Sequence, residues 1–388
     1  MERFKKITIS ILSTLAFLLV CVFLGLYGTT EETDTVEMQD MDICMDFLCK
    51  DIYIDGVLVN NYQLQSAFLT HRDKVYVPLT EEMGKAMGFT AEYNAEEDVL
   101  TLSRTAEEGS GEGCFYHLFG WDLGPGRGVG RATTKLYVTS CLAEERGKEA
   151  RSFKAGSAEE WDLPLEEQFY SEQKGCWFIP LYVFAESEAF PNISFCQDKY
   201  TGVYISTKED IPAEQYLEAN ANNESFIKGR VEYITGCNPY VDEDTAIYYE
   251  YLFRHEAVTR QLDEDLLIAM TKGESCFTAD DISHTGAIGL MQIQPASARA
   301  NNWDPETLYD PHLNLEFGSM YIRDKISIYG SVELALVAYY WGSVNREKLA
   351  DGTLDRTYSN YILNIYNGIH TIMDRKGCSN IFNTTIVL

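Results

Sequence analysis

The 388-residue chain has few basic residues and few histidines, and both shortages exclude classes of function. Lysine and arginine number 31 against 60 aspartates and glutamates, which gives a formal charge of −29, and no basic block could neutralise phosphates. Nucleic-acid binding is therefore not expected. The six histidines are scattered without an HExxH motif, and the sequence has no CxxC pair. We therefore expect no metal site and no cofactor.

Long apolar runs are also rare, and the clearest one lies near the N-terminus. The 21 residues from Ile7 to Tyr27 carry no charge, which at about 1.5 Å per residue matches the roughly 30 Å core of a bilayer. Three basic residues precede this run and three acidic residues follow it, namely Arg3, Lys5, Lys6, Glu31, Glu32 and Asp34. We expect residues 1–30 to be a cytoplasmic stub and transmembrane signal-anchor of a single-pass protein of the cell membrane, with the body on the extracytoplasmic face. A cleaved signal peptide is the alternative.

The cysteines do not define a disulfide framework. Of the ten, Cys21 lies inside the apolar run, so nine remain outside, and an odd number cannot all pair within one chain. An external location permits disulfides, but the irregular spacing assigns no pairing.

The middle of the chain is predicted to be rich in β-strands. After an acidic linker at 31–50, residues 51–104 contain strand and turn patterns, a short helical pattern that Gly88 ends, and an alternating strand. A similar order returns later, where Pro180 follows Pro78 by 180 − 78 = 102 residues. We therefore predict a second, weaker β-rich repeat with an insertion at 105–210.

The repeated elements Val75-Tyr-Val-Pro-Leu79 and Trp177-Phe-Ile-Pro-Leu181 are each followed by a predicted strand, Val99-Leu-Thr-Leu-Ser103 and Gly202-Val-Tyr-Ile-Ser206. This arrangement is similar to the copper amine oxidase N-terminal-like domain. That family is a stalk module of secreted Gram-positive proteins, so the resemblance implies a spacer or wall-associating stalk. A β domain without a binding role of its own is equally open. The family name implies no copper here, because the matched residues include no ligand set.

Residues 211–243 are polar and are predicted to form a linker, whereas 244–378 show helical periodicity. Within this helical region, Leu267 and Met270 lie on one apolar face, and Glu274 falls on the same face near the end of the helix. Burial and the negative end of the helix dipole both disfavour a carboxylate. We therefore predict a raised pKa for Glu274, as a general acid near neutral pH requires. A solvated residue after an early helix end at Gly273 is the alternative.

The surrounding residues closely resemble the soluble lytic transglycosylase family, whose members act on peptidoglycan. The matching blocks are Glu274-Ser-Cys-Phe277, Ser283-His-Thr-Gly-Ala-Ile-Gly-Leu-Met-Gln-Ile-Gln-Pro295, Leu308-Tyr-Asp-Pro311, Asn314, Gly318 and Ala338-Tyr339. The resemblance implies an all-α lysozyme-like domain at 244–378. The whole chain is thus predicted to be a multidomain α+β protein with a transmembrane helix, a β-rich stalk region and this domain.

The same resemblance implies roles for individual residues. Glu274 would be the catalytic acid/base, and Tyr361 matches the tyrosine that lies near the catalytic glutamate. Further positions would line the glycan cleft, namely Ser275, Ser283, Gly286, Gly289, Met291, Gln292, Tyr339 and Tyr340. The glycines would let backbone approach a sugar, and Gln292 offers both a donor and an acceptor.

The expected reaction needs only one carboxylate. Hydrolytic glycosidases use two, whereas the resemblance implies that the C6 hydroxyl of MurNAc attacks C1 and leaves a 1,6-anhydroMurNAc end. Two departures from the family bear on this: Tyr340 stands where the family has Asn, and Thr357 stands where an acidic residue is common. A muramidase in which Asp280 or Asp281 assists water and a non-catalytic glycan-binding or assembly factor stay open as alternatives.

Overall fold

The structure is a computed structural model that describes most of the chain from residue 42 onward. The described residues are 42–61, 64, 66–94, 96, 99–105, 142–146, 152–155, 159–161, 169–171, 175–187 and 189–388. The predicted membrane helix at 7–27 lies outside these ranges. In the described part of the chain, no helix combines the length and the apolar character needed to cross a bilayer.

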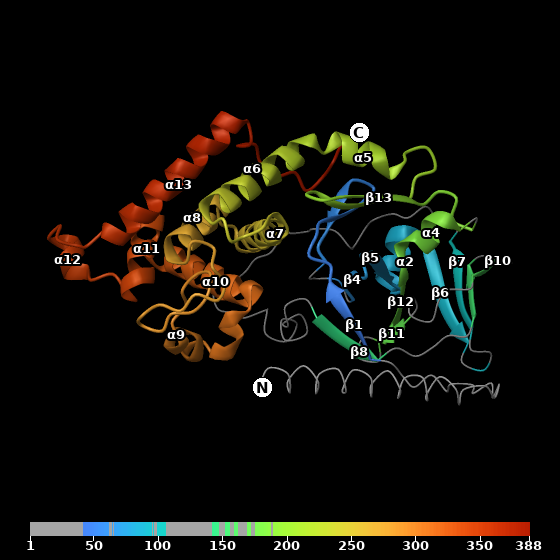
Figure 1. Cartoon of the computed structure of the whole chain (residues 1–388), viewed down its shortest axis with the longest axis horizontal. Coiled ribbons are helices and arrows are strands. Elements are labelled where there is room, and N and C mark those ends of the chain that lie inside the picture. The colour runs from blue at the N-terminus through green and yellow to red at the C-terminus, as the bar shows by residue number, and fades with distance from the viewer. Residues whose placement is uncertain are drawn as a thin grey trace, which may run out of the picture. The chain divides into compact units, whose positions relative to one another are not determined.

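The β-strands of the described residues form three sheets (Figure 1). One has the strand order β11-β12-β5-β4-β1-β8, the second β10-β9-β7-β6 and the third β13-β14-β2-β3. The strands are β1 Asp42–Phe47, β2 Ile52–Ile54, β3 Val57–Val59, β4 Leu69–His71, β5 Lys74–Pro78, β6 Phe89–Asn94, β7 Val99–Arg104, β8 Leu142–Arg146, β9 Ser152–Ala155, β10 Glu159–Trp161, β11 Phe169–Ser171, β12 Cys176–Pro180, β13 Ser194–Asp198 and β14 Gly202–Ser206.

The two predicted β-rich repeats share their sheets and do not form separate bodies. Strands β5 and β12, which carry the repeated Pro-Leu elements, pair antiparallel with Ile179 opposite Val77. Each leads into a short helix, α2 (Glu81–Met87) or α4 (Leu181–Glu186). Strand β14 also pairs in parallel with β2. The structure therefore differs from the predicted division between 51–104 and 105–210, because these pairings satisfy backbone groups that separate domains would leave at open edges.

After α2 and α4, the remaining helices of the described residues begin at 213, inside the predicted linker. They are α5 Ala213–Ala219, α6 Ala221–Cys237, α7 Glu243–Arg260, α8 Glu264–Glu274, α9 Pro295–Ala300, the 3₁₀ helix η3 Pro305–Tyr309, α10 Pro311–Tyr329, α11 Val332–Trp341, α12 Arg346–Ala350 and α13 Thr357–Lys376. The polar residues that suggested a linker are buried partners of the sheet: Asn220 donates to Tyr204 Oη at 2.6 Å and Asn223 to Tyr53 Oη at 3.1 Å. Likewise, residues 42–47 of the predicted acidic linker form β1.

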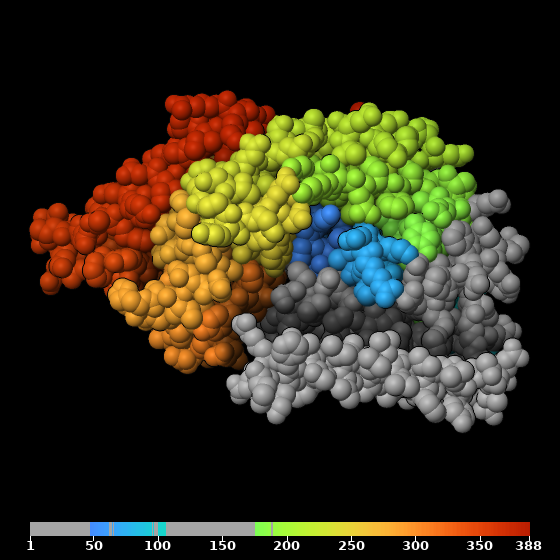
Figure 2. All heavy atoms as spheres, viewed as in Figure 1, coloured from blue at the N-terminus to red at the C-terminus, as the bar shows by residue number. Residues whose placement is uncertain are grey.

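Buried contacts join the sheets to the helices. Arg254 of α7 donates to Asp51 Oδ1 at 2.8 Å and also pairs with Glu250, and all three side chains are buried. The C-terminal segment returns to the sheet, where the backbone N–H of Leu58 donates to the carbonyl of Thr384. Figure 2 shows the early residues in blue beside green and yellow residues that come much later in the chain. Because these contacts span the sequence, the described part is organised by long-range packing.

Candidate active site

Helix α8 positions Glu274 at its last turn. Asp263 caps the start of the helix by accepting from the backbone N–H of Asp265, and the interior of α8 is apolar and buried. Leu267 and Met270 are fully buried on the face that Glu274 continues. The helix therefore ends with a carboxylate directed toward the interior of the helical region, as the periodicity predicts.

The partner of this carboxylate is a tyrosine of α13. Tyr358 Oη donates a hydrogen bond to Glu274 Oε1. Burial raises the pKa of Glu274 to about 7, and the hydrogen bond from Tyr358 opposes the rise. Burial also raises the pKa of Tyr358 well above its ordinary value, so the phenol stays protonated and acts as a donor. Glu274 can thus change its protonation state near neutral pH.

Close packing of α13 on α8 brings Tyr358 to this position. A Cβ at Gly273 would lie 2.4 Å from Ile362 Cδ1 and 3.2 Å from Tyr361 Cε1, so only a residue without a side chain allows this approach. Tyr361, which the family resemblance placed near the glutamate, lies against Gly273 and is 50% exposed. Tyr358 is not among the predicted site residues, although it stands one helical turn before Tyr361 on α13.

The segment 283–292 forms a short folded loop beside α8. Ile288 makes antiparallel bridges to Ile282 and Ile293. Gly286 and Gly289 both have positive φ angles, 82° and 80°. A Cβ at Gly289 would lie 2.2 Å from Asn314 Nδ2, whereas a Cβ at Gly286 would meet open space. Gly289 is therefore required for packing as well as conformation, while Gly286 leaves room on the loop surface.

Buried amide and hydroxyl groups fix this loop to the helices. Asn314 of α10 accepts from the backbone N–H of Met291 at 2.8 Å and donates to two carbonyls, those of Ile288 and Leu308, also at 2.8 Å. Ser275 Oγ donates to the Leu290 carbonyl at 2.8 Å. The residue after Glu274 is thereby tied to the loop.

The predicted cleft residues in and beside the loop differ in how deeply they are buried. Ser275 and Met291 are buried, and Met291 packs against Gly318 of α10. Gln292 is half-buried and donates to the carbonyls of Gly289 and Asp281 at 3.1 and 3.2 Å. Ser283 accepts from the Ala287 N–H at 2.9 Å. In the structure these side chains hold the loop in shape.

Aromatic residues at the end of α11 surround the tyrosine partner of Glu274. Tyr339 donates to the Met291 carbonyl at 2.8 Å. The ring of Tyr340 stacks on Tyr358 with centroids 4.8 Å apart and an interplanar angle of 19°. Tyr340 and Trp341 are each 58% exposed. The residue that departs from the family pattern therefore supports the Tyr358 ring and presents an aromatic surface beside the carboxylate.

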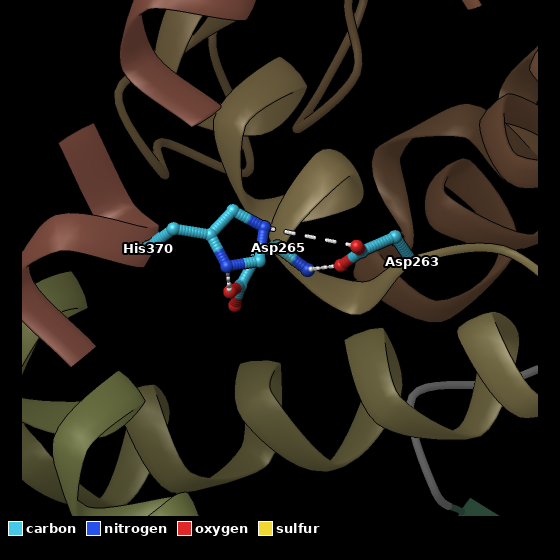
Figure 3. Close-up of side chains that lie close together, drawn as sticks. All are labelled: Asp263, Asp265 and His370. Carbon is cyan, nitrogen blue, oxygen red and sulfur yellow. Dashed lines mark hydrogen bonds and ion pairs between the residues drawn. The ribbon is translucent and has the colours of Figure 1, made fainter. Parts of the chain in front are cut away.

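A second group of titratable side chains lies at the opposite end of α8. It consists of Asp263, Asp265 and, from α13, His370 (Figure 3). His370 Nδ1 lies 3.4 Å from Asp265 Oδ2 and Nε2 lies 3.7 Å from Asp263 Oδ2. Donor types of this kind suit a metal, but the two ring nitrogens face different carboxylates, and Arg230 Nη2 lies 3.0 Å from Asp265 Oδ1. The geometry is that of an ionic contact joining α8 to α13 and α6.

Comparison with known proteins identifies the helical region. The family model described as Transglycosylase SLT domain matches residues 251–362. A transglycosylase of Enterobacteria phage PRD1 is 35% identical over 82 residues, which are 21% of this chain and 30% of that protein. Membrane-bound lytic murein transglycosylase F of Alteromonas mediterranea is 38% identical over 88 residues, 23% of this chain and 18% of that protein. The matched segments thus span less than a third of these curated relatives.

Among solved structures, the 70 kDa soluble lytic transglycosylase of Escherichia coli aligns with a TM-score of 0.30 and 19% identity. The alignment covers 45% of this chain and 32% of that chain.

Proposed function

Residues 251–362 form a transglycosylase SLT domain, and from this premise we propose that the chain is a membrane-anchored peptidoglycan lytic transglycosylase. It cleaves the β-1,4 bond between MurNAc and GlcNAc and leaves 1,6-anhydroMurNAc ends, with Glu274 as the single acid/base. The observation that carries the proposal is the half-buried Glu274 carboxyl, whose pKa burial raises to about 7 against the hydrogen bond from Tyr358.

The proton balance of the reaction fits one such group. Protonated Glu274 gives its proton to the glycosidic oxygen as the bond from C1 to that oxygen breaks. The resulting carboxylate then takes the proton of the MurNAc C6 hydroxyl as that oxygen bonds to C1. Glu274 ends protonated, no water is consumed, and the product is lighter by one water than the hydrolytic product.

The surroundings of Glu274 support a mechanism with one carboxylate. Burial and Tyr358 are the causes of its pKa shift, and no neighbouring carboxylate among the described residues contributes to it. A nucleophilic carboxylate of a retaining hydrolase would lie about 5–5.5 Å away and raise the pKa further. Of the two candidates of the muramidase alternative, Asp280 and Asp281, the carboxylate of Asp281 lies 3.4 Å from the amide of Gln292.

The aromatic residues beside the site extend the proposal to substrate contact. Tyr340 is exposed and stacks on the ring that bonds Glu274, and the exposed Trp341 packs edge-on against Tyr340. Aromatic faces of this kind stack on the apolar faces of sugar rings. We assign the same glycan contact to the exposed ring of Tyr361.

The anchor and the stalk are the remaining parts of the proposal. Residues 1–30 would hold the enzyme in the membrane with its body outside, and the sheets at 51–210 would act as a spacer. Membrane fractionation before and after alkaline carbonate washing tests the anchor. Release of the chain by carbonate would contradict it.

Digestion of purified peptidoglycan by the full-length chain in detergent tests the activity. We expect muropeptides lacking one water in mass spectra, and their loss with Glu274→Gln. Glu306→Gln is the matched control, because Glu306 is exposed on η3. Reducing-end products that depend on Asp280 or Asp281 would indicate a muramidase. Folded protein that binds the glycan and releases nothing would indicate a binding or assembly role.

A further inference from the structure

Two thiols lie next to each other beside Glu274. Cys237 ends α6, and Cys276 follows Glu274 by two residues. Both are free thiols and half-buried. The sulfur of Cys276 lies 3.4 Å from the carbonyl oxygen of Cys237. The Cys276 thiol thus lies against the end of α6, beside a cysteine 39 positions away in the sequence.

A lysine ammonium contacts both sulfurs. Lys272 of α8 donates to Cys276 Sγ at 3.0 Å, and it also bonds the thiol of Cys237. The hydrogen bond to Cys276 raises the pKa of Lys272, so the ammonium stays charged. One positive charge thus neighbours both sulfurs, and thiolate is the reactive form of cysteine.

The backbone around the thiols is held in a strained shape. Cys276 and Phe277 have φ angles of 51° and 63°, a region that residues with side chains rarely adopt. Asn238, the residue after Cys237, donates to the Cys276 carbonyl at 2.9 Å. Phe277 is fully buried and packs edge-on against Phe253. These contacts keep the two cysteines together.

We propose that Cys237 and Cys276 are a redox-active pair that closes into a disulfide and ties the end of α6 to the segment directly after Glu274. The sulfurs share one ammonium as a neighbour, so side-chain rotation brings them toward the bonding distance of about 2.05 Å. Cys378 is excluded as the partner of Cys237, because it packs at Gly229, about 12 Å farther along α6.

The oxidation is a thiol–disulfide exchange with a disulfide-carrying oxidant. The Cys276 thiolate attacks one sulfur of the oxidant, which forms a mixed disulfide and releases one thiol. The Cys237 thiolate then attacks Cys276 Sγ and releases the second thiol. Two protein thiols lose two electrons, the oxidant disulfide gains them, and the two thiol protons end on the released thiols.

Burial raises the pKa of Cys237, and the contacts of its thiol with Tyr233 and Lys272 oppose the rise. We assign Cys237 as the second nucleophile, which attacks after Cys276 has formed the mixed disulfide. The proposed external location would favour the oxidised form. The pair itself does not depend on the proposed glycan activity.

Peptide mapping of the full-length chain tests the pair. The folded protein is incubated with glutathione and glutathione disulfide, alkylated and digested with trypsin, which places the two cysteines on separate peptides, 231–254 and 273–299. We expect these peptides joined, with a mass two hydrogens below their sum, and separated again by reduction. Both peptides alkylated after oxidation, or either one linked to another cysteine, would overturn the proposal.

Thermal unfolding gives a second measurement. Oxidation of the wild-type chain should raise Tm by about 5 °C or more, because the bond closes a long loop in the unfolded state. Cys237→Ser and Cys276→Ser should abolish this rise, and Cys196→Ser should retain it, since Cys196 lies on β13. A rise that persists in both pair variants would contradict the assignment. If a pair variant fails to fold, the wild-type peptide map still decides the question.

Discussion

The two ends of α8 carry carboxyl groups in opposite electrostatic surroundings. At the N-terminal end, Asp265 faces the guanidinium of Arg230 and the ring of His370. At the C-terminal end, the neutral phenol of Tyr358 bonds Glu274, and no cation contributes to its pKa shift. Burial raises the pKa of both carboxyls, but a cation opposes the rise only at the first end. One end is therefore suited to hold helices together, and the other to exchange a proton.

Removing the cation at the N-terminal end should have the largest effect on stability. Arg230→Met keeps the apolar stem but leaves Asp265 buried without the guanidinium that faces it. Loss of one partner of a buried ion pair costs about 3–5 kcal/mol in the free energy of unfolding. Urea denaturation measures this loss. Lys85→Ala, which removes an exposed pair with Glu81, serves as the control and should leave the midpoint unchanged.

At the C-terminal end of α8, a substitution is expected to increase the free energy of unfolding. Glu274 has a pKa of about 7 in the folded chain against about 4.3 when unfolded, so folding is penalised once both states are ionised. Glu274→Gln should therefore stabilise the chain at pH 8 by up to about 3 kcal/mol. At pH 4 the difference should nearly vanish, because both states are then mostly protonated. Equal effects at the two pH values would show that the site does not perturb this carboxyl.

The hydrogen bond from Tyr358 should set the pH range of activity. The acid must be protonated, so activity should fall as the pH rises through about 7. Tyr358→Phe removes a bond that lowers the pKa of Glu274, and the alkaline limb should move upward by about one pH unit or more. Tyr361→Phe is the matched control. A shift with Tyr361→Phe and none with Tyr358→Phe would favour the family-based assignment over the structural one.

The smallest effect is expected at His370. Its ring is 40% exposed and Asp263 is 45% exposed, so this part of the contact is largely in solvent. His370→Gln should reduce the free energy of unfolding by about 1 kcal/mol or less. A loss comparable with that of Arg230→Met would mean that the imidazole, and not the guanidinium, holds this end of α8.

Much of the helical site could be predicted from local pattern. The spacing of Leu267, Met270 and Glu274 predicts an inward carboxylate, and the structure places it at the last turn of α8. Apolar residues recur with helical spacing from Tyr358 to Ile369, which predicts a helix, and the structure has α13 there. Periodicity identifies the face of a helix, but it does not identify the side chain that meets that face.

The β region was harder to predict. Strand patterns around Val77 and Ile179 are local, but their antiparallel pairing joins segments 102 residues apart. Asn220 and Asn223 lie in the predicted linker at 211–243, because no local pattern indicates that their amides contact buried tyrosines of the sheet. Pairing partners are selected by tertiary packing.

The sequence by itself determined the acidic surface, the periodic helices and the position of Glu274 on an apolar face. Only the tertiary structure decided that Tyr358 bonds the carboxylate, that Cys237 and Cys276 share Lys272, and that the two repeats share sheets. The physical reason is the difference in sequence separation between the two kinds of contact. Helical periodicity depends on neighbours within four residues, whereas these contacts depend on how close α13, α6 and β12 can approach segments far away in the chain.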